Sequence, residues 1–131
     1  MHSPQFSPNF AKGGGFITAV AVDADNGQVL MLASMNEEAF RLTLETGKVH
    51  YYSRSRNKLW KKGESSGNMQ ELVEMRVDCD IDAVVVRVRQ RGPACHEGYK
   101  SCFFRTVQPD GTLRVDAERL MDPEKMYGGK S

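Results

Sequence analysis

The chain has 131 residues, with 18 basic and 17 acidic side chains and a formal net charge of +1. This length fits one domain over 1–131, and the balanced charge gives no support for a nucleic-acid partner or a membrane surface. The first fifteen residues lack the apolar run of a signal peptide, and no later stretch reaches the roughly 18 apolar residues of a transmembrane helix. We therefore expect a cytoplasmic protein with a flexible N-terminus over 1–15.

The first predicted elements are two antiparallel strands. Residues 16–22 and 29–33 are rich in Val, Ile, Leu and Ala. The Asn26-Gly27 pair between them is a strong hairpin signal, because both residues tolerate the positive φ angles of a tight turn.

A short helix follows the hairpin. Asn36 is suited to an N-cap, two glutamates follow it in the first turn, and Gly47 supplies a C-terminal stop, which predicts a helix over about 37–46. Residues 49–53 then indicate a strand. The polar and basic stretch 54–68 has no clean period, and we expect it to be a long functional loop.

The second half predicts further strands. Residues 71–78 and 83–90 carry many β-branched side chains, and 103–107 is a candidate final strand before a turn at 109–111. The tail over 116–131 has room for a short helix. The expected fold class is therefore α+β and predominantly β, with antiparallel hairpins in a mixed sheet and one short helix.

The segment Asp78-Cys79-Asp80-Ile81-Asp82 combines hard and soft metal ligands. Carboxylate oxygens suit Mg²⁺ or Mn²⁺, and thiolates suit Zn²⁺. In a strand, Asp78 and Asp80 would point to one face and Cys79 to the other, so one segment could serve two metal sites.

A shared Mg²⁺ requires this segment to bend. In a flat strand Asp78 and Asp82 would lie about 13 Å apart, whereas Mg²⁺ needs its ligands at about 2.0 to 2.1 Å. The sequence therefore predicts a hairpin tip between 73–77 and 83–88. The alternative is a solvated turn without a metal, since Asp is common in turns.

Cysteine usage also favours a metal. The chain has three cysteines, Cys79, Cys95 and Cys102, which is an odd number for a disulfide framework. Three protein ligands plus water is the arrangement of catalytic zinc, in which the metal lowers the pKa of the water towards about 7. The alternative is three buried, inert cysteines.

The stretch 53–68 has the composition of a site for phosphate and a planar base. It holds five cations, four hydroxyls and two glycines around a single tryptophan, without the spacing of a P-loop. An exposed basic loop is the alternative. The candidates for substrate contacts are Arg54, Arg56, Trp60, Lys61, Lys62, Ser65 and Ser66.

Proton carriers are less well marked. His96, beside Cys95, is a candidate general acid or base, with an extra metal ligand or a plain surface side chain as the alternatives, and Glu64 is a second candidate proton carrier. His50 lies in an apolar strand and is expected to be a packed core residue.

Three motifs follow one another along the chain. The first is His50-Tyr51-Tyr52-Ser53-Arg54-Ser55-Arg56 with Lys58-Leu59-Trp60-Lys61-Lys62-Gly63-Glu64. The second is Asp78-Cys79-Asp80-x-Asp82, and the third is Gly92-Pro93-Ala94-Cys95-His96 with Ser101-Cys102-Phe103. Together they resemble phosphoribosyl-AMP cyclohydrolase of histidine biosynthesis. The resemblance runs from about Phe16 to Arg105, and the tail over 106–131 lies outside it.

The resemblance implies an intertwined homodimer that acts on a nucleotide. It implies one Zn²⁺ per subunit, held at the interface by Cys95 and Cys102 of one chain and Cys79 of the other, with Mg²⁺ at Asp78, Asp80 and Asp82. It also implies hydrolytic opening of the purine ring of N1-(5-phosphoribosyl)-AMP between N1 and C6. The mechanistic hypothesis is attack by zinc-activated water, with His96 moving a proton.

Two rival functions remain open. One is a non-enzymatic module that dimerises around a structural metal and binds nucleotides or RNA through its basic loop. The other is a nucleobase deaminase, although the chain lacks an H-x-E motif with a P-C-x-x-C partner.

Overall fold

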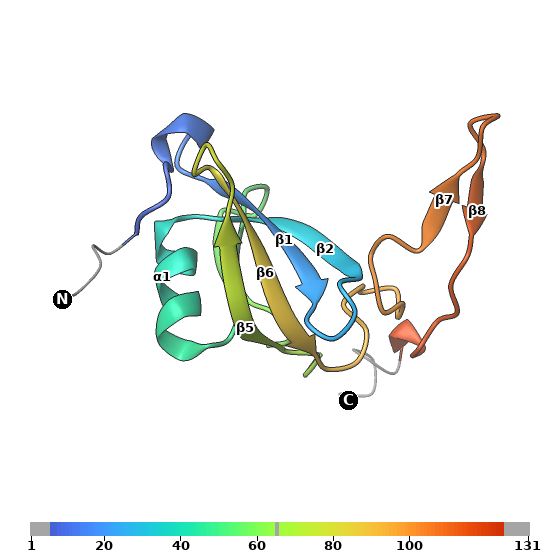
Figure 1. Ribbon diagram of the computed structural model, residues 1–131. Coiled ribbons are helices and arrows are strands. Elements are labelled where there is room, and N and C mark those ends of the chain that lie inside the picture. The colour runs from blue at the N-terminus through green and yellow to red at the C-terminus, as the bar shows by residue number, and fades with distance from the viewer. Residues whose placement is uncertain (1–5, 65, 125–131) are drawn as a thin grey trace.

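The computed structural model describes residues 6–64 and 66–124. Its elements in chain order are η1 (Ala11–Gly13), β1 (Ile17–Asp23), β2 (Val29–Met35), α1 (Glu37–Thr46), β3 (His50–Ser53), β4 (Lys58–Lys61), β5 (Gln70–Val77), β6 (Ala83–Gln90), β7 (Arg105–Val107) and β8 (Leu113–Val115). The prediction of a mostly β, α+β fold with one short α-helix is confirmed for these residues (Figure 1).

The central sheet is mixed, as predicted. Its four strands have the order β2-β1-β6-β5, in which β1 and β6 run parallel while β1–β2 and β5–β6 are antiparallel. The hairpin predicted from the Asn-Gly pair is present, with Gly27 at a φ of 76°. Two smaller sheets, β3–β4 and β7–β8, each contain two antiparallel strands.

The helix α1 begins and ends where the capping residues predict. The Asn36 side chain accepts a hydrogen bond from the Ala39 amide at 2.9 Å, and Gly47 adopts the left-handed conformation with a φ of 73°. A glycine tolerates this conformation because it has no Cβ to clash with the backbone.

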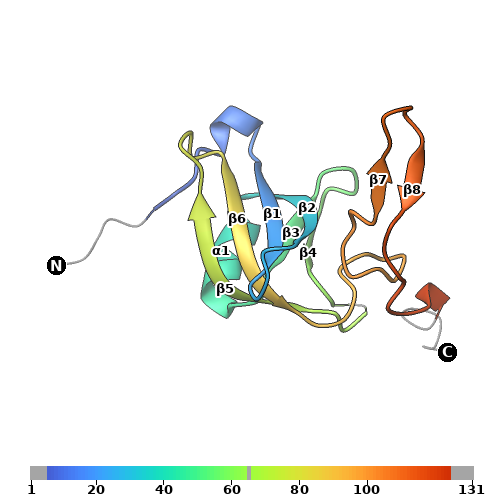
Figure 2. The same ribbon diagram turned by 45° about the vertical axis from the view of Figure 1, so that its right-hand side comes forward.

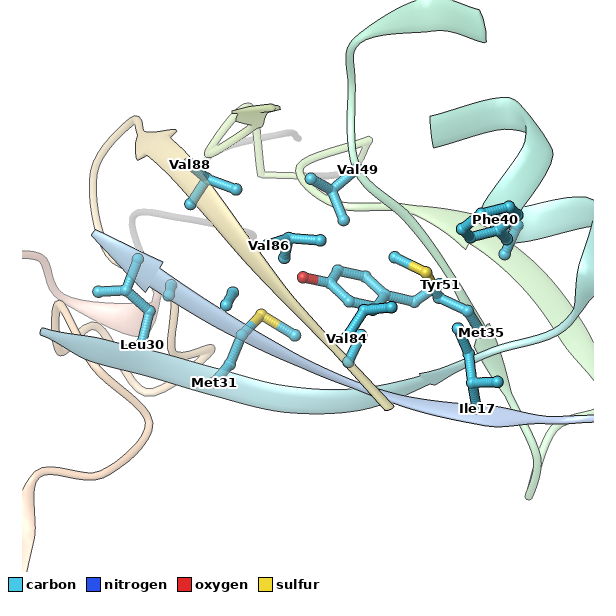
Figure 3. Packing of buried hydrophobic residues seen from close by; sticks show 14 residues of the cluster. Ile17, Leu30, Met31, Met35, Phe40, Val49, Tyr51, Val84, Val86 and Val88 are labelled. Carbon is cyan, nitrogen blue, oxygen red and sulfur yellow. The ribbon is translucent and has the colours of Figure 1, made fainter. Parts of the chain in front are cut away.

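The core lies on one face of the central sheet, which α1 and β3–β4 cover (Figure 2). Alternate residues of β6, Val84, Val86 and Val88, point into it, as the two-residue period of a strand requires. Figure 3 shows Tyr51 of β3 among these valines. Its buried hydroxyl donates to Gln70 Oε1 at 2.7 Å, which satisfies both polar groups inside the core.

Three predictions about element boundaries were wrong in part. The expected loop over 54–68 contains β4, which pairs with β3. Strand β5 ends at Val77, before the aspartate segment, so the alternation of faces expected for Asp78, Cys79 and Asp80 does not apply. The sequence indicated a strand near 103–107 but not its partner β8.

The β7–β8 hairpin extends away from the central sheet (Figure 1). Every residue of its two strands is exposed. In the tail over 116–131, where a short helix was expected, residues 116–122 form no helix, and residues 125–131 lie outside the described residues. None of the helices described for this chain has both the length and the apolar character needed to cross a membrane.

Candidate active site

A pocket of about 610 Å³ lies at the β3–β4 hairpin and the loop that follows β4. Five of the predicted substrate contacts line it, namely Arg56, Trp60, Lys61, Lys62 and Ser66. Arg54 is absent from the lining, and its guanidinium lies 4.7 Å from the centre of the Phe16 ring. Ser65 lies outside the described residues.

A tight turn forms one wall of this pocket. Gly63 has a φ of 87°, and the Gly67 amide donates to its carbonyl at 2.8 Å. The Glu64 carboxylate accepts a hydrogen bond from the Lys61 amide at 3.1 Å, which fixes the start of the turn. The wall therefore presents several cations and one carboxylate, a composition suited to an anionic ligand that also offers hydrogen-bond donors.

Cys95 and Cys102 come together in a second loop, which begins after β6. Backbone hydrogen bonds from Ala94 N to Lys100 O at 2.9 Å and from Cys95 N to Tyr99 O at 3.1 Å make it a compact hairpin, here called the thiol hairpin (94–102). Cys95 is buried and Cys102 is half-buried. Burial, and secondly the neighbouring Cys95 thiol, raise the pKa of Cys102 to about 11. Two adjacent thiols of this kind match the soft donors that Zn²⁺ prefers.

Lys62 joins the pocket to the thiol hairpin. Its side chain turns inward from the pocket wall, is only 8% exposed, and donates from Nζ to the Ala94 carbonyl at 2.6 Å. Burial lowers the pKa of Lys62, while the Cys102 and Cys95 thiols act in the opposite direction. The pocket and the thiols are therefore parts of one continuous region.

The predicted hairpin tip is present between β5 and β6. Asp78 Oδ1 accepts the amides of Asp82 at 3.1 Å and Ala83 at 3.3 Å, and Ile81 adopts a φ of 55°. We call residues 78–82 the aspartate turn. Such side-chain acceptance of nearby amides is a common means by which aspartate stabilises turns.

Asp80 and Asp82 converge on one cation. Lys12 Nζ lies 3.1 Å from a carboxylate oxygen of each, although it is far away in the sequence. The Lys12 ammonium lowers the pKa of both carboxyl groups. The two carboxylates can therefore face a single positive charge, as a shared Mg²⁺ would require.

Cys79 lies far from the other two thiols. It is exposed in the aspartate turn, where its Sγ donates to Asp80 Oδ1 at 3.3 Å. The whole of β6 separates it from the thiol hairpin (Figure 1). Within residues 6–64 and 66–124 of one chain, no group of three His, Cys, Asp or Glu side chains is arranged to hold a metal ion.

The histidines differ in their surroundings. His96 is exposed next to the buried Cys95. His50 is buried, and its Nδ1 lies 2.8 Å from the Lys48 carbonyl oxygen, as the expectation of a packed residue requires. Glu64 lines the pocket, whereas His96 is not among the lining residues.

Sequence reasoning did not single out Lys12 or the inward turn of Lys62. Lys12 belongs to a Gly-rich stretch with no local signal, and it meets the aspartate turn only through the folded chain. Lys62 looked the same as its neighbour Lys61, since composition does not distinguish an exposed lysine from a buried one.

Comparisons with known proteins agree with the resemblance found in the motifs. The family model for phosphoribosyl-AMP cyclohydrolase matches residues 31–104, which include all three cysteines and all three aspartates of the candidate metal sites. The chain is 56% identical over 131 residues to a phosphoribosyl-AMP cyclohydrolase of Nitrobacter hamburgensis, with 96% of this chain and 88% of that protein covered.

Two further relatives carry the same name. A protein of that name from Nitratidesulfovibrio vulgaris is 50% identical over 123 residues, covering 93% of this chain and 97% of its own length. Another, from Methanothermobacter thermautotrophicus, is 56% identical over 117 residues, covering 88% of this chain and 85% of its own. The chain therefore belongs to the phosphoribosyl-AMP cyclohydrolase family of enzymes.

Proposed function

We propose that this enzyme hydrolyses the bond between N1 and C6 of the purine ring of N1-(5-phosphoribosyl)-AMP, with the help of a zinc ion shared by two chains. The observation that carries the proposal is the continuity of the cationic pocket with the thiol hairpin through Lys62. A nucleotide anchored in the pocket by its phosphates would present its base near a metal held by the thiols.

The donor set fits zinc, although one chain does not complete it. Cys95 and Cys102 supply two adjacent soft ligands, and the third thiol, Cys79, lies beyond the far end of β6. A second copy of the chain would bring its own Cys79 to this thiol pair. We therefore propose a homodimer with ligands from both chains, in which zinc would lower the pKa of a bound water and so supply the nucleophile.

The aspartate turn fits a hard cation. Asp80 and Asp82 already face the Lys12 ammonium, and Asp78 lies in the same turn with one oxygen engaged by backbone amides. We propose that Mg²⁺ binds at Asp78, Asp80 and Asp82. There it would add positive charge for a substrate that carries two phosphate groups.

The pocket residues have distinct tasks in this proposal. Arg56, Lys61 and Ser66 line the pocket and can donate hydrogen bonds to phosphate oxygens, and Trp60 can stack on a planar ring. Arg54 lies over Phe16, outside the pocket lining, and is the outermost candidate for a phosphate contact in sequence order.

Two residues can move the proton that the reaction requires. His96 follows the ligand Cys95, and Glu64 lines the pocket. Because three thiolates reduce the Lewis acidity of zinc, a nearby proton carrier gains importance. We assign this role to His96, with Glu64 as the alternative. A near-normal kcat in the His96→Ala variant would contradict the assignment.

The direct test combines an assay with metal analysis. Purified protein should open the purine ring of phosphoribosyl-AMP and contain about one zinc per chain. Asp80→Asn should reduce activity and the response to added Mg²⁺ while the protein stays folded. A protein that binds the nucleotide without turnover would instead be a binding module, and unchanged Mg²⁺ dependence in Asp80→Asn would remove the aspartate turn as the magnesium site.

A further inference from the structure

Lys62 is placed differently from every other lysine of the pocket. Lys61 and Lys58 also line the pocket and are half-buried or exposed, whereas only 8% of Lys62 is accessible. The Lys62 amide donates to the Val49 carbonyl at 3.0 Å, which anchors its backbone to the start of β3. Its ammonium then meets the Ala94 carbonyl at 2.6 Å, directly before Cys95.

Further contacts join the same two loops. The Gln90 side-chain amide donates to the carbonyls of Asn68 at 3.0 Å and Arg91 at 2.9 Å, and the Arg91 amide donates to the Met69 carbonyl at 3.0 Å. The Asn68 side chain lies so close to Gly92 that a Cβ there would be 2.6 Å from Asn68 Oδ1. The entry to the thiol hairpin is therefore fixed against the pocket loop, with Lys62 as the contact nearest to Cys95.

The buried Lys62 ammonium has no carboxylate partner among the described residues, since none of the ion pairs found there includes it. A buried charge is costly unless it is paired. The groups that influence it electrostatically are the thiols of Cys95 and Cys102. These become thiolates when they bind a metal, so metal binding would provide the missing opposite charge.

We propose that Lys62 is a positioning residue for the zinc ligands: it holds the Ala94 carbonyl, and with it Cys95, and its positive charge offsets the negative charge of the thiolates. This inference rests on the zinc site of the proposed function. Zn²⁺ with three thiolates carries a formal charge of −1, which one lysine ammonium neutralises. Lys62 is then a partner of the metal ligands rather than a direct contact of a substrate phosphate.

The two roles of a lysine in this place predict different kinetics. A phosphate contact supports substrate binding, so its loss raises KM and leaves the affinity for zinc unchanged. A partner of the metal ligands supports metal binding, and the loss of such a group typically costs about tenfold to a hundredfold in metal affinity.

The test uses the full-length protein in three variants. Lys62→Met removes the charge and the donor at similar length, whereas Lys62→Arg keeps a charge and donors. Lys48→Met is the control, because Lys48 does not line the pocket and its Nζ pairs with Glu71 Oε1 at 3.3 Å. Zinc affinity is measured by competition with a chromophoric chelator. Spectra of the Co²⁺-substituted proteins report thiolate coordination, and KM and kcat are measured at saturating zinc.

We expect Lys62→Met to bind zinc at least about tenfold more weakly than wild type, with a KM within about threefold of wild type. Lys62→Arg should recover part of the affinity, and Lys48→Met should behave as wild type. Unchanged zinc affinity with a raised KM would overturn the inference and make Lys62 a substrate contact. If Lys62→Met and Lys62→Arg lose equal amounts of zinc affinity, the positive charge of Lys62 does not support zinc binding, and that part of the inference is overturned.

Controls separate this inference from the proposed function. If wild type itself binds no zinc, the proposed metal site fails, and the inference fails with it. If wild type and Lys48→Met bind zinc and the Lys62 variants bind it equally tightly, the inference alone fails. Thermal melts of the metal-free proteins detect a loss of folding, and Lys62→Gln, which keeps a donor, replaces Lys62→Met if the latter does not fold.

Discussion

Cys79 and Cys95 lie beyond opposite ends of β6, one in the aspartate turn and the other in the thiol hairpin (Figure 1). β6 has eight residues. At roughly 3.3 Å per residue such a strand is about 25 Å long. Two ligands of one zinc ion lie only a few Å apart, so thiols at these two positions of one chain do not share an ion without unfolding the strand.

This separation makes the proposed sharing of a zinc site between two chains testable by complementation. Cys79→Ser and Cys95→Ser should each abolish zinc binding and activity, because each removes one of the three proposed ligands. A mixed dimer of the two variants would contain one intact site, with Cys95 and Cys102 from one chain and Cys79 from the other. Random re-pairing of an equal mixture should therefore restore about a quarter of wild-type activity.

The measurement is activity after subunits of the two inactive variants are exchanged under mild denaturation. Wild type treated in the same way controls for recovery, and each variant treated alone controls for reversion. Activity that stays absent in the mixture, while treated wild type recovers, would mean that the three thiols do not combine across chains.

Lys12 and a bound Mg²⁺ compete for the same carboxylates in our proposal. The Lys12 ammonium lies 3.1 Å from oxygens of both Asp80 and Asp82; the Lys12 and Asp80 side chains are exposed and that of Asp82 is half-buried. Lys12→Met should therefore lower the Mg²⁺ concentration that gives half-maximal activity, whereas Lys12→Arg should leave it close to wild type. Magnesium titrations of the three proteins measure this. A higher Mg²⁺ requirement in Lys12→Met would instead mean that Lys12 supports the metal site.

Gly63 is a tightly constrained position of the pocket wall. It has a φ of 87°, and a Cβ there would lie 2.5 Å from the backbone nitrogen of Met69. Backbone does not move aside as a flexible side chain does, so Gly63→Ala should displace the turn that carries Glu64 and Ser66. We expect KM to rise at least about tenfold.

Gly111→Ala is the matched control for this prediction. Gly111 has a similar φ of 88° in the β7–β8 turn, but no atom lies within 4 Å of its added Cβ. It therefore incurs only the conformational strain of a left-handed residue, about 1–2 kcal/mol. Equal kinetic effects of the two substitutions would show that strain, rather than the contact with Met69, is responsible.

Elements with local signals could be predicted from the sequence. The Asn26-Gly27 turn, the Asn36 cap and the Gly47 stop depend on neighbouring residues alone, and the structure places all three as expected. Strand β4 was missed because two of its four residues are lysines and the two apolar residues between them are adjacent, so Lys58–Lys61 shows no apolar alternation. Its pairing with β3 depends on tertiary contacts that a local pattern does not contain.

The candidate site was predictable in its residue types rather than in its geometry. Composition grouped seven residues of one stretch as substrate contacts, and five of these seven candidates line one pocket. The pairing of Lys12 with Asp80 of the aspartate turn joins positions 68 residues apart, and a local sequence pattern does not predict such a contact. Likewise, the inward orientation of Lys62 follows from the packing of two loops, which only the folded chain reveals.

The last prediction concerns acid stability, through the pair that ties the thiol hairpin to β1. Lys100 Nζ lies 2.6 Å from Asp23 Oδ2, and the Asp25 amide donates to Asp23 Oδ1 at 2.8 Å. The hydrogen bond from Lys100, and secondly that from Asp25, lower the pKa of Asp23 in the folded protein. In the unfolded chain an aspartate titrates near pH 3.9.

A lowered folded-state pKa means that the ionised carboxylate stabilises the fold. This stabilisation, on the order of 1 kcal/mol for a partly exposed pair, is complete above about pH 4 and is lost as the pH falls through the folded pKa. Urea unfolding of the metal-free protein measures this. Near neutral pH the free energy of unfolding of wild type should exceed that of Asp23→Asn, and this difference should shrink below about pH 4. Glu118→Gln, which removes an exposed carboxyl of the tail, is the control. If the difference in free energy of unfolding between wild type and Asp23→Asn does not change with pH, the charge of Asp23 does not stabilise the fold.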